Sequence, residues 1–186
     1  MSMRIQTTII FALAAFLMIT STPPTKAGQQ PYAGQQNRPV KALSEQVIEG
    51  LKTGGGLGMA KTAELNRYPG PLHILELADK INLTDQQRNT VEALYRQMKA
   101  EAIPKGIKLI AAEVALEKLF SQGTVTLKNL KETVSKIARL KGELRVVHLK
   151  YHLKSKPLLT DQQLKMYTNL RGYSNGAHKK HEHGSH

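Results

Sequence analysis

The sequence predicts an all-α protein: a long antiparallel helical hairpin with short flanking helices. Three observations carry this prediction. Apolar residues recur at spacings of three and four along two long segments, residues 85–121 and 127–155. The pentapeptide Leu-Thr-Asp-Gln-Gln occurs twice, at 83–87 and 159–163, each time where a helix should begin. No segment shows the alternation of apolar and polar residues that indicates a half-buried strand.

The chain opens with the pattern of a secretory signal peptide, residues 1–27. Arg4 supplies a short positive region, residues 9–19 are almost wholly apolar, and Thr25-Lys26-Ala27 places small residues at the −3 and −1 positions of a cleavage site. The apolar run is shorter than the ~20 residues that a membrane span needs. We therefore expect cleavage, a periplasmic location and no stable membrane anchor.

Residues 28–40 contain Gly-Gln-Gln twice and two prolines, so we expect a disordered lead-in. The helical domain is predicted over residues 41–172 and begins with short helices. Ser44 is suited to cap the first of these helices, and Pro71 is suited to the first position of the third. The three short helices are expected over residues 45–52, 59–65 and 71–80.

Two long helices and a short last helix should follow. The apolar stripe of the segment 85–121 is predicted on Val91, Leu94, Met98, Ile107, Ile110 and Val114. Pro104 removes a backbone hydrogen bond at a cost of ~3 kcal/mol, so we expect a kink near residues 100–104. Pro157 should end the second long helix, and a last helix should run from Thr160 to about Leu170.

The repeated pentapeptide supplies the reason for two of these helix starts. In each copy the threonine can act as N-cap and the glutamine three residues later can reach back to the N–H of the cap, which is a capping box. The aspartate between them sits at the first helical position, where it complements the helix dipole. The repeat is therefore interpreted as structural rather than catalytic. The predicted structural caps are Thr84, Gln87, Thr160 and Gln163.

Charge and composition limit the partners. The formal net charge is +13, and removal of the leader lowers it to +11. An exported protein with three Phe, six Tyr and no Trp has few rings for base stacking, so we expect no nucleic-acid partner. Cysteine is absent, which excludes disulfides and thiolate metal sites. A single helical hairpin forms a thin layer that cannot cover both of its faces, so a homodimer is expected.

Two Leu-Thr-x-x-Gln strings in a small, helical, exported chain resemble the Spy/CpxP family of periplasmic proteins. The resemblance covers roughly residues 70–186 and also includes the His-rich tail. It implies an antiparallel, cradle-like helical dimer. It further implies one of three functions: ATP-independent chaperoning, zinc binding or heavy-metal sensing, or regulation of a membrane sensor kinase through its periplasmic domain.

The tail, residues 173–186, is expected to be disordered and carries the strongest metal-binding signal. Neutral imidazole is a good ligand for zinc, copper or nickel. Lys179 and Lys180 repel a dication, which leaves a solvated terminus as the alternative. The candidate ligands are His178, His181, Glu182, His183 and His186. We expect no required cofactor; zinc or another divalent transition metal is the candidate ligand of the tail.

His148 and His152 form a weaker candidate metal pair, four residues apart on one helical face. Lysines and arginines crowd that stretch, so packing or surface hydrogen bonding is the favoured interpretation. His73, alone on an apolar helix, is interpreted as structural. The run Gly55 to Thr62 is one glycine short of a phosphate-binding loop and has no preceding strand, so it is interpreted as a hinge.

No nucleophile motif is visible, and two of the three aspartates stand at helix starts, so we expect a binding protein and not an enzyme. The main hypothesis is a periplasmic ATP-independent chaperone or envelope-stress protein that holds unfolded or misfolded clients through apolar and cationic helix surface. The alternatives are a heavy-metal protein using the tail and an adaptor of a sensor kinase. The candidate client-binding residues are Arg88, Arg96, Lys99, Lys136, Arg139 and Arg145.

Overall fold

The computed structural model of this protein describes residues 30–174. The predicted signal peptide and residues 175–186 of the predicted tail lie outside the described residues, and so do all five candidate ligands of the tail. Residues 30–34 form a turn and belong to a separate unit. Residues 35–174 contain only helices and connecting turns, which confirms the all-α prediction.

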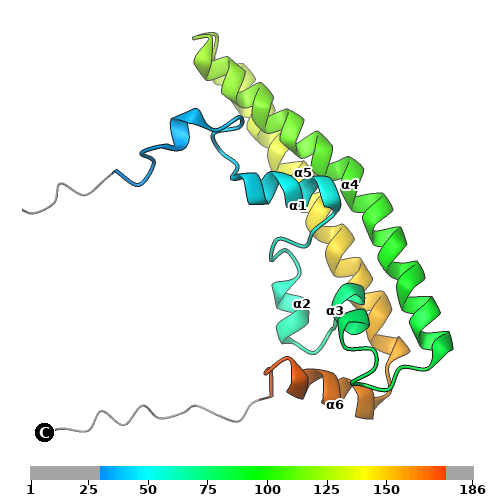
Figure 1. Ribbon diagram of the computed structural model, residues 1–186. Coiled ribbons are helices and arrows are strands. Elements are labelled where there is room, and N and C mark those ends of the chain that lie inside the picture. Colours follow the sequence, from blue (N-terminus) through cyan, green and yellow to red (C-terminus); the bar gives the residue numbers. More distant parts are fainter. Residues whose placement is uncertain (1–29, 175–186) are drawn as a thin grey trace, which may run out of the picture. The chain divides into compact units, whose positions relative to one another are not determined.

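The helices follow one another along residues 35–174 without an intervening strand (Figure 1). Two of them are single-turn 3-10 helices, η1 and η2, and six are α-helices. In chain order they are η1 (Gln35–Asn37), α1 (Glu45–Thr53), α2 (Lys61–Leu65), α3 (Pro71–Glu76), α4 (Asp85–Ser121), α5 (Leu127–Ser155), η2 (Lys156–Leu158) and α6 (Asp161–Leu170).

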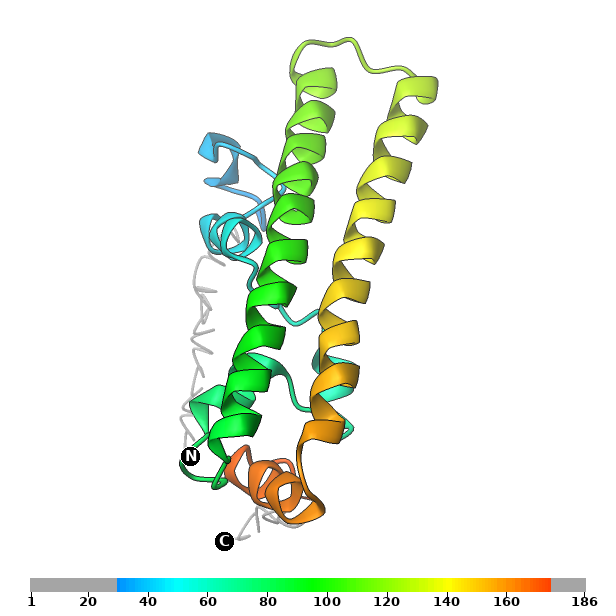
Figure 2. The same cartoon turned by 90° about the vertical axis from the view of Figure 1, so that its right-hand side faces the viewer.

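Helices α4 and α5 form the hairpin and run antiparallel side by side (Figure 2). Each starts with a capping box, at Thr84 for α4 and at Thr126 for α5. The interface is apolar and belongs to a core cluster that includes Met98, Ala102, Leu109, Ala112, Ile137, Leu140, Leu144, Val147 and Tyr151. Three ion pairs also join the two helices: Lys105–Glu143, Lys141–Glu113 and Lys150–Glu101.

The short helices pack on one face of the hairpin: α1 to α3 lie to the left of α4 in Figure 1, and in Figure 2 α1 projects beyond the edge of α4. Gly106 allows α1 to approach α4 closely. A Cβ on Gly106 would lie 2.2 Å from the backbone oxygen of Leu51 in α1, so only glycine lets the two helices meet at this distance. The other face of the hairpin has no covering helix within residues 35–174 (Figure 2).

The two copies of the pentapeptide meet at the end of the hairpin away from its turn. Both capping boxes are present, which confirms the predicted structural caps. The side-chain amides of Gln87 and Gln163 also lie 2.9 Å apart, nitrogen to oxygen, in both directions. Each amide nitrogen is moreover within 3.1 Å of the backbone oxygen just before the other copy, at Leu158 and Asn82 respectively. A smaller core cluster centred on Ile74, Ile81, Val91 and Tyr167 packs at this end.

The helix boundaries agree with the sequence for α1, α4, α5 and α6, whereas α2 and α3 are shorter than predicted. The prediction that Ile107 belongs to the apolar stripe of α4 is wrong, because its side chain is 53% exposed. The small residues Ala102, Gly106 and Ala112 occupy the buried face instead. Helix α4 continues through Pro104.

The core begins earlier than the predicted domain boundary at residue 41. Val40, at the end of the predicted lead-in, is buried against the main cluster, and Lys41 pairs with Glu117 of α4. Among the described residues, no helix is both long and apolar enough to cross a membrane.

Candidate functional site

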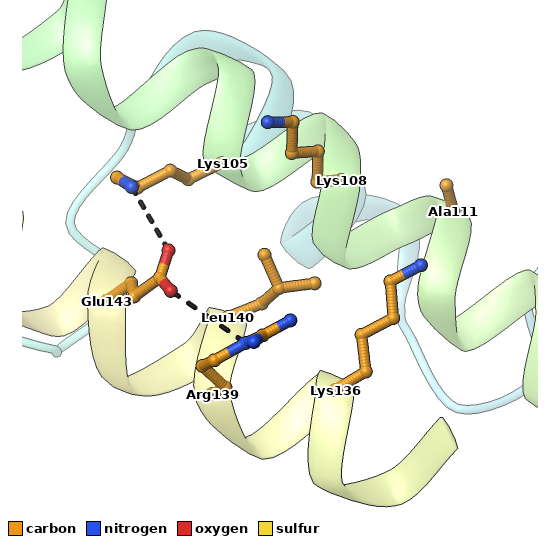
Figure 3. A pocket seen from close by; sticks show the side chains of 7 residues that line it. All are labelled: Lys105, Lys108, Ala111, Lys136, Arg139, Leu140 and Glu143. Carbon is orange, nitrogen blue, oxygen red and sulfur yellow. Dashed lines mark hydrogen bonds and ion pairs between the residues drawn. The ribbon is translucent and has the colours of Figure 1, made fainter. Parts of the chain in front are cut away.

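The uncovered face of the hairpin contains a cationic groove between α4 and α5 (Figure 3). We use this name for the pocket of about 460 Å³ that is lined by Lys105, Lys108, Ala111, Lys136, Arg139, Leu140 and Glu143. Leu140 is buried at its floor, and the charged side chains rise from the two helices on either side. Four cations and one carboxylate give the lining a net positive charge.

Glu143 neutralises part of this charge. Its carboxylate lies 3.1 Å from the Lys105 amine and 4.0 Å from the Arg139 Nε. Lys108 and Lys136 are exposed and have no carboxylate within ion-pair distance among the described residues (Figure 3). The groove therefore offers two unpaired ammonium groups beside an apolar floor, which is suited to segments that carry both acidic and apolar side chains.

Exposed apolar side chains extend the groove along α5. Val146 and Leu153 are 63% and 62% exposed, and they follow Arg139 at intervals of seven residues, which places all three on one side of the helix. A second exposed apolar group lies near the turn of the hairpin, at Phe120, Leu127 and Val134. A scatter of single apolar residues is ordinary on a protein surface, so only the row that continues the groove is considered further.

The remaining cations that were predicted to bind clients are dispersed. Arg88 pairs with Asp79 at 2.5 Å, and Arg96 pairs with Glu92 one helical turn earlier at 3.6 Å. Lys99 lies over the ring of Tyr95, with its amine 5.7 Å from the ring centre. Arg145 is exposed on α5 and does not line the cationic groove. Of the six predicted residues, the groove thus brings together Lys136 and Arg139.

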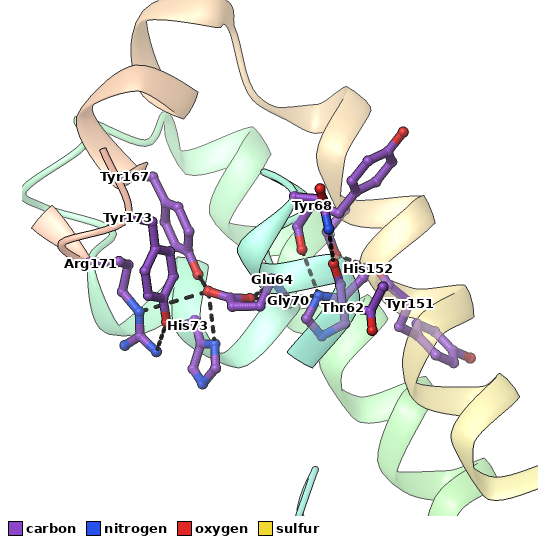
Figure 4. A network of polar contacts seen from close by, with 12 residues as sticks. Thr62, Glu64, Tyr68, Gly70, His73, Tyr151, His152, Tyr167, Arg171 and Tyr173 are labelled. Carbon is purple, nitrogen blue, oxygen red and sulfur yellow. Dashed lines mark hydrogen bonds and ion pairs between the residues drawn. The ribbon is translucent and has the colours of Figure 1, made fainter. Parts of the chain in front are cut away.

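A second polar centre surrounds the carboxylate of Glu64 in α2 (Figure 4). Its side chain is buried and accepts a hydrogen bond from the Tyr167 hydroxyl of α6. It also lies 3.4 Å from His73 Nδ1, 3.6 Å from His152 Nδ1 and 3.8 Å from the Arg171 guanidinium. One carboxylate thus contacts α3, α5 and the end of α6.

The surroundings of Glu64 favour its ionised form. Burial alone would raise the pKa of Glu64, but the close contact with His73 and the hydrogen bond from Tyr167 outweigh it, so the pKa lies below its ordinary value. Burial and the same bond raise the pKa of the Tyr167 hydroxyl, which stays protonated as the donor. Glu64 contacts groups from three other helices, so the arrangement is suited to holding helices together.

His148 and His152 are both buried, in line with the interpretation that they pack. His152 Nδ1 lies 2.6 Å from the Tyr68 carbonyl oxygen, which can only accept, so this nitrogen carries the proton. A Cβ on Gly70 would lie 2.6 Å from Nε2 of the same ring, so glycine is required there. Burial lowers the pKa of both histidines. Within residues 30–174 there is no group of three or more His, Asp or Glu side chains that could hold a metal ion.

Comparison with known proteins adds no identification. No protein-family model matches the chain, and neither a curated protein nor a solved structure matches it.

Sequence reasoning missed Lys105, Lys108 and the central role of Glu64. The two lysines flank the buried Gly106 and fall three residues apart on one face of α4, a spacing that was visible in the sequence. Glu64 stands in a short helix with no motif around it, and nothing local indicates that it would be buried.

Proposed function

We propose that this chain is an ATP-independent chaperone of the Spy/CpxP type, which holds unfolded periplasmic proteins on the uncovered face of its helical hairpin. One observation carries the proposal: the cationic groove, with the unpaired Lys108 and Lys136, adjoins the exposed apolar row at Val146 and Leu153. The resemblance of the two Leu-Thr-Asp-Gln-Gln strings to that family supports it.

The physical argument concerns what an unfolded chain presents. Such a chain exposes apolar side chains and acidic groups in variable order, so a receptor needs both kinds of contact but no fixed shape. Exposed charge pairs contribute only about 0–1 kcal/mol each, and single apolar contacts are similarly weak. The surface of α4 and α5 therefore supports binding that is broad in specificity and rapidly reversible.

The test is suppression of client aggregation by the mature protein and by Lys108→Glu combined with Lys136→Glu. Reversal of both charges lowers the charge of the groove by four units, so protection of an acidic client should fall at least about fivefold, a change of ~1 kcal/mol. Light scattering of a thermally unfolded acidic client, measured against chaperone concentration, gives the comparison.

Lys128→Glu combined with Lys131→Glu is the matched control, because both lysines are exposed on α5 and lie outside the cationic groove. It should leave protection close to that of the parent protein. An equal loss of protection in the control would mean that the effect arises from the net charge of the protein and not from the groove. Undiminished protection in the double variant would exclude the groove as the client site, and no protection by the parent protein would refute the chaperone proposal.

A further inference from the structure

The opposite face of the hairpin holds a second cavity that the proposed function does not use. This cavity has a volume of about 380 Å³ and lies between the loop after α1, the start of α3, and the inner sides of α4 and α5. We call it the histidine pocket, because His73, His148 and His152 all line it. Its volume lies within the range of small-molecule sites.

Two histidines of this pocket have a buried nitrogen without a hydrogen bond, His73 Nδ1 and His148 Nε2, but His73 Nδ1 lies 3.4 Å from the Glu64 carboxylate, whereas His148 has no charged partner among the described residues. Its ring is 2% exposed, and its Nε2 is buried without a hydrogen bond. No hydrogen bond to its Nδ1 occurs among the described residues, and this nitrogen would lie 4.0 Å from a Cβ built on Gly56, across the pocket wall. A neutral imidazole always carries one donor and one acceptor, and buried polar groups in proteins are nearly always paired.

The charge of the pocket wall indicates the sign of a ligand. Lys99 of α4 lines the pocket, and its stem packs on Gly54, where an added Cβ would be 3.5 Å from Lys99 Cγ. No aspartate or glutamate is among the described residues that line the cavity. The buried carboxylate of Glu64 contacts His73 and His152 from outside the cavity and is paired there with Tyr167 and Arg171. The ammonium group of Lys99 is therefore the charge that the cavity itself presents, and it favours an anion.

The rest of the wall is apolar. Met98 and Tyr95 of α4 line the cavity beside Lys99, and Pro71 and Leu72 line it from α3. Such a wall favours an organic body attached to the anionic head, because apolar surface gains about 25 cal/mol per Å² when it leaves water.

We propose that the histidine pocket binds a small organic carboxylate, with the anionic head between Lys99 and His148 and the apolar body against Met98 and Tyr95. This site is independent of the cationic groove, which lies on the other face of the hairpin. A carboxylate ends free organic acids and also polypeptide chains, and both sources present the same chemistry to the pocket.

Titration calorimetry with 3-phenylpropanoate on the mature protein tests the proposal. We expect saturable binding that shifts the NMR resonances of the His148 ring. The neutral amide, 3-phenylpropanamide, should bind at least tenfold more weakly, and inorganic phosphate should not compete. N-acetylphenylalanine imitates the carboxyl end of a polypeptide chain. If it binds more tightly than 3-phenylpropanoate, the ligand is a chain end; if it binds more weakly, the ligand is a free organic acid.

Two substitutions localise the site. Gly56→Leu adds a side chain that points across the pocket towards His148 at a position without positive φ, so binding should be lost. Its matched control is Gly142→Leu on α5, where nothing lies within 4 Å of an added Cβ. Lys99→Met should weaken binding at least tenfold, whereas Lys108→Met in the cationic groove should not change it.

Several outcomes would overturn the proposal. These are the absence of saturable binding at millimolar probe, equal affinity for carboxylate and amide, competition by phosphate, and retained binding in Gly56→Leu. If Gly56→Leu does not fold, as judged by its thermal melt, Lys99→Met decides alone: retained affinity overturns the site.

Discussion

Gln87 and Gln163, 76 residues apart, hydrogen-bond to each other through their side-chain amides, and each also caps its own helix. The repeated pentapeptide therefore joins two helix starts as well as forming them. Only an amide can do both, because the oxygen accepts from the local backbone N–H while the nitrogen donates across to the other copy.

Gln87→Glu separates these two roles. Glutamate is as good as glutamine in a capping box and better placed against the helix dipole, so a purely local cap would be unchanged or slightly stabilised. Because the carboxylate cannot donate to Leu158 and Gln163, we expect a loss of about 1–3 kcal/mol in the free energy of unfolding. Urea denaturation measures it. An unchanged midpoint in Gln87→Glu would contradict the cross-link.

Gly106→Ala should destabilise the protein although alanine is the better helix former. The helix propensity gain is at most ~1 kcal/mol, whereas the new Cβ would lie 2.2 Å from a backbone oxygen of α1, which has to move. Overpacking of this kind costs about 1–3 kcal/mol, so the net change should be a loss. Gly142→Ala on the exposed side of α5 should instead stabilise. Thermal melts of the two variants should thus shift in opposite directions.

Tyr167→Phe tests the centre at Glu64. The substitution keeps the buried ring and removes one donor from a buried carboxylate, so we expect a loss of about 1.5–3 kcal/mol. Tyr173→Phe is the matched control, since among residues 30–174 its hydroxyl has a hydrogen bond only from Arg171, at 3.5 Å, and it should change stability by less than ~0.5 kcal/mol. Similar losses of stability in the two variants would mean that the hydrogen bond from the Tyr167 hydroxyl to Glu64 does not contribute specifically to stability.

Stability should fall as the pH is lowered from 7.5 to 5.5. Burial lowers the pKa of His148 and His152 in the folded state, so the unfolded chain binds more protons as the pH passes its ordinary histidine pKa of ~6.5. The free energy of unfolding therefore rises with pH in this window. The lowered pKa of Glu64 acts only at more acidic pH, where protonation of its carboxylate removes stability.

His148→Gln provides the measurement for this pH dependence. Glutamine is polar and does not titrate, so the slope of stability against pH between 5.5 and 7.5 should become shallower, whatever the loss in absolute stability. Denaturant melts at five pH values would show it, and a slope equal to that of the parent protein would rule out His148 as a contributor.

The sequence was a good guide to local structure because its signals are local. Threonine caps located the starts of α4 and α6, the three-and-four spacing located α4 and α5, and Ser44 located α1. The spacing of large apolar residues wrongly placed Ile107 on the buried face of α4. The close approach of α1 requires small residues on that face, and small residues are weak indicators of a buried stripe in a sequence.

The candidate sites were harder to predict because they depend on contacts between distant segments. The burial of Glu64 rests on Tyr167, 103 residues later, and no pattern in either segment indicates the other. The cationic groove was half predicted, through Lys136 and Arg139 on α5. Its other half, on α4, follows only from the register in which the two helices pair.

The spread of these contacts along the chain has a consequence for the order of folding. Lys105 and Glu143 are 38 residues apart, the two glutamines 76, and Tyr167 and Glu64 103. Closing a longer loop costs more chain entropy. The contacts between α4 and α5 should therefore form first near the turn of the hairpin, and α6 should pack onto the hairpin last. By the same reasoning α6 should detach first, and its amide protons should exchange with solvent sooner than those at the middle of α5.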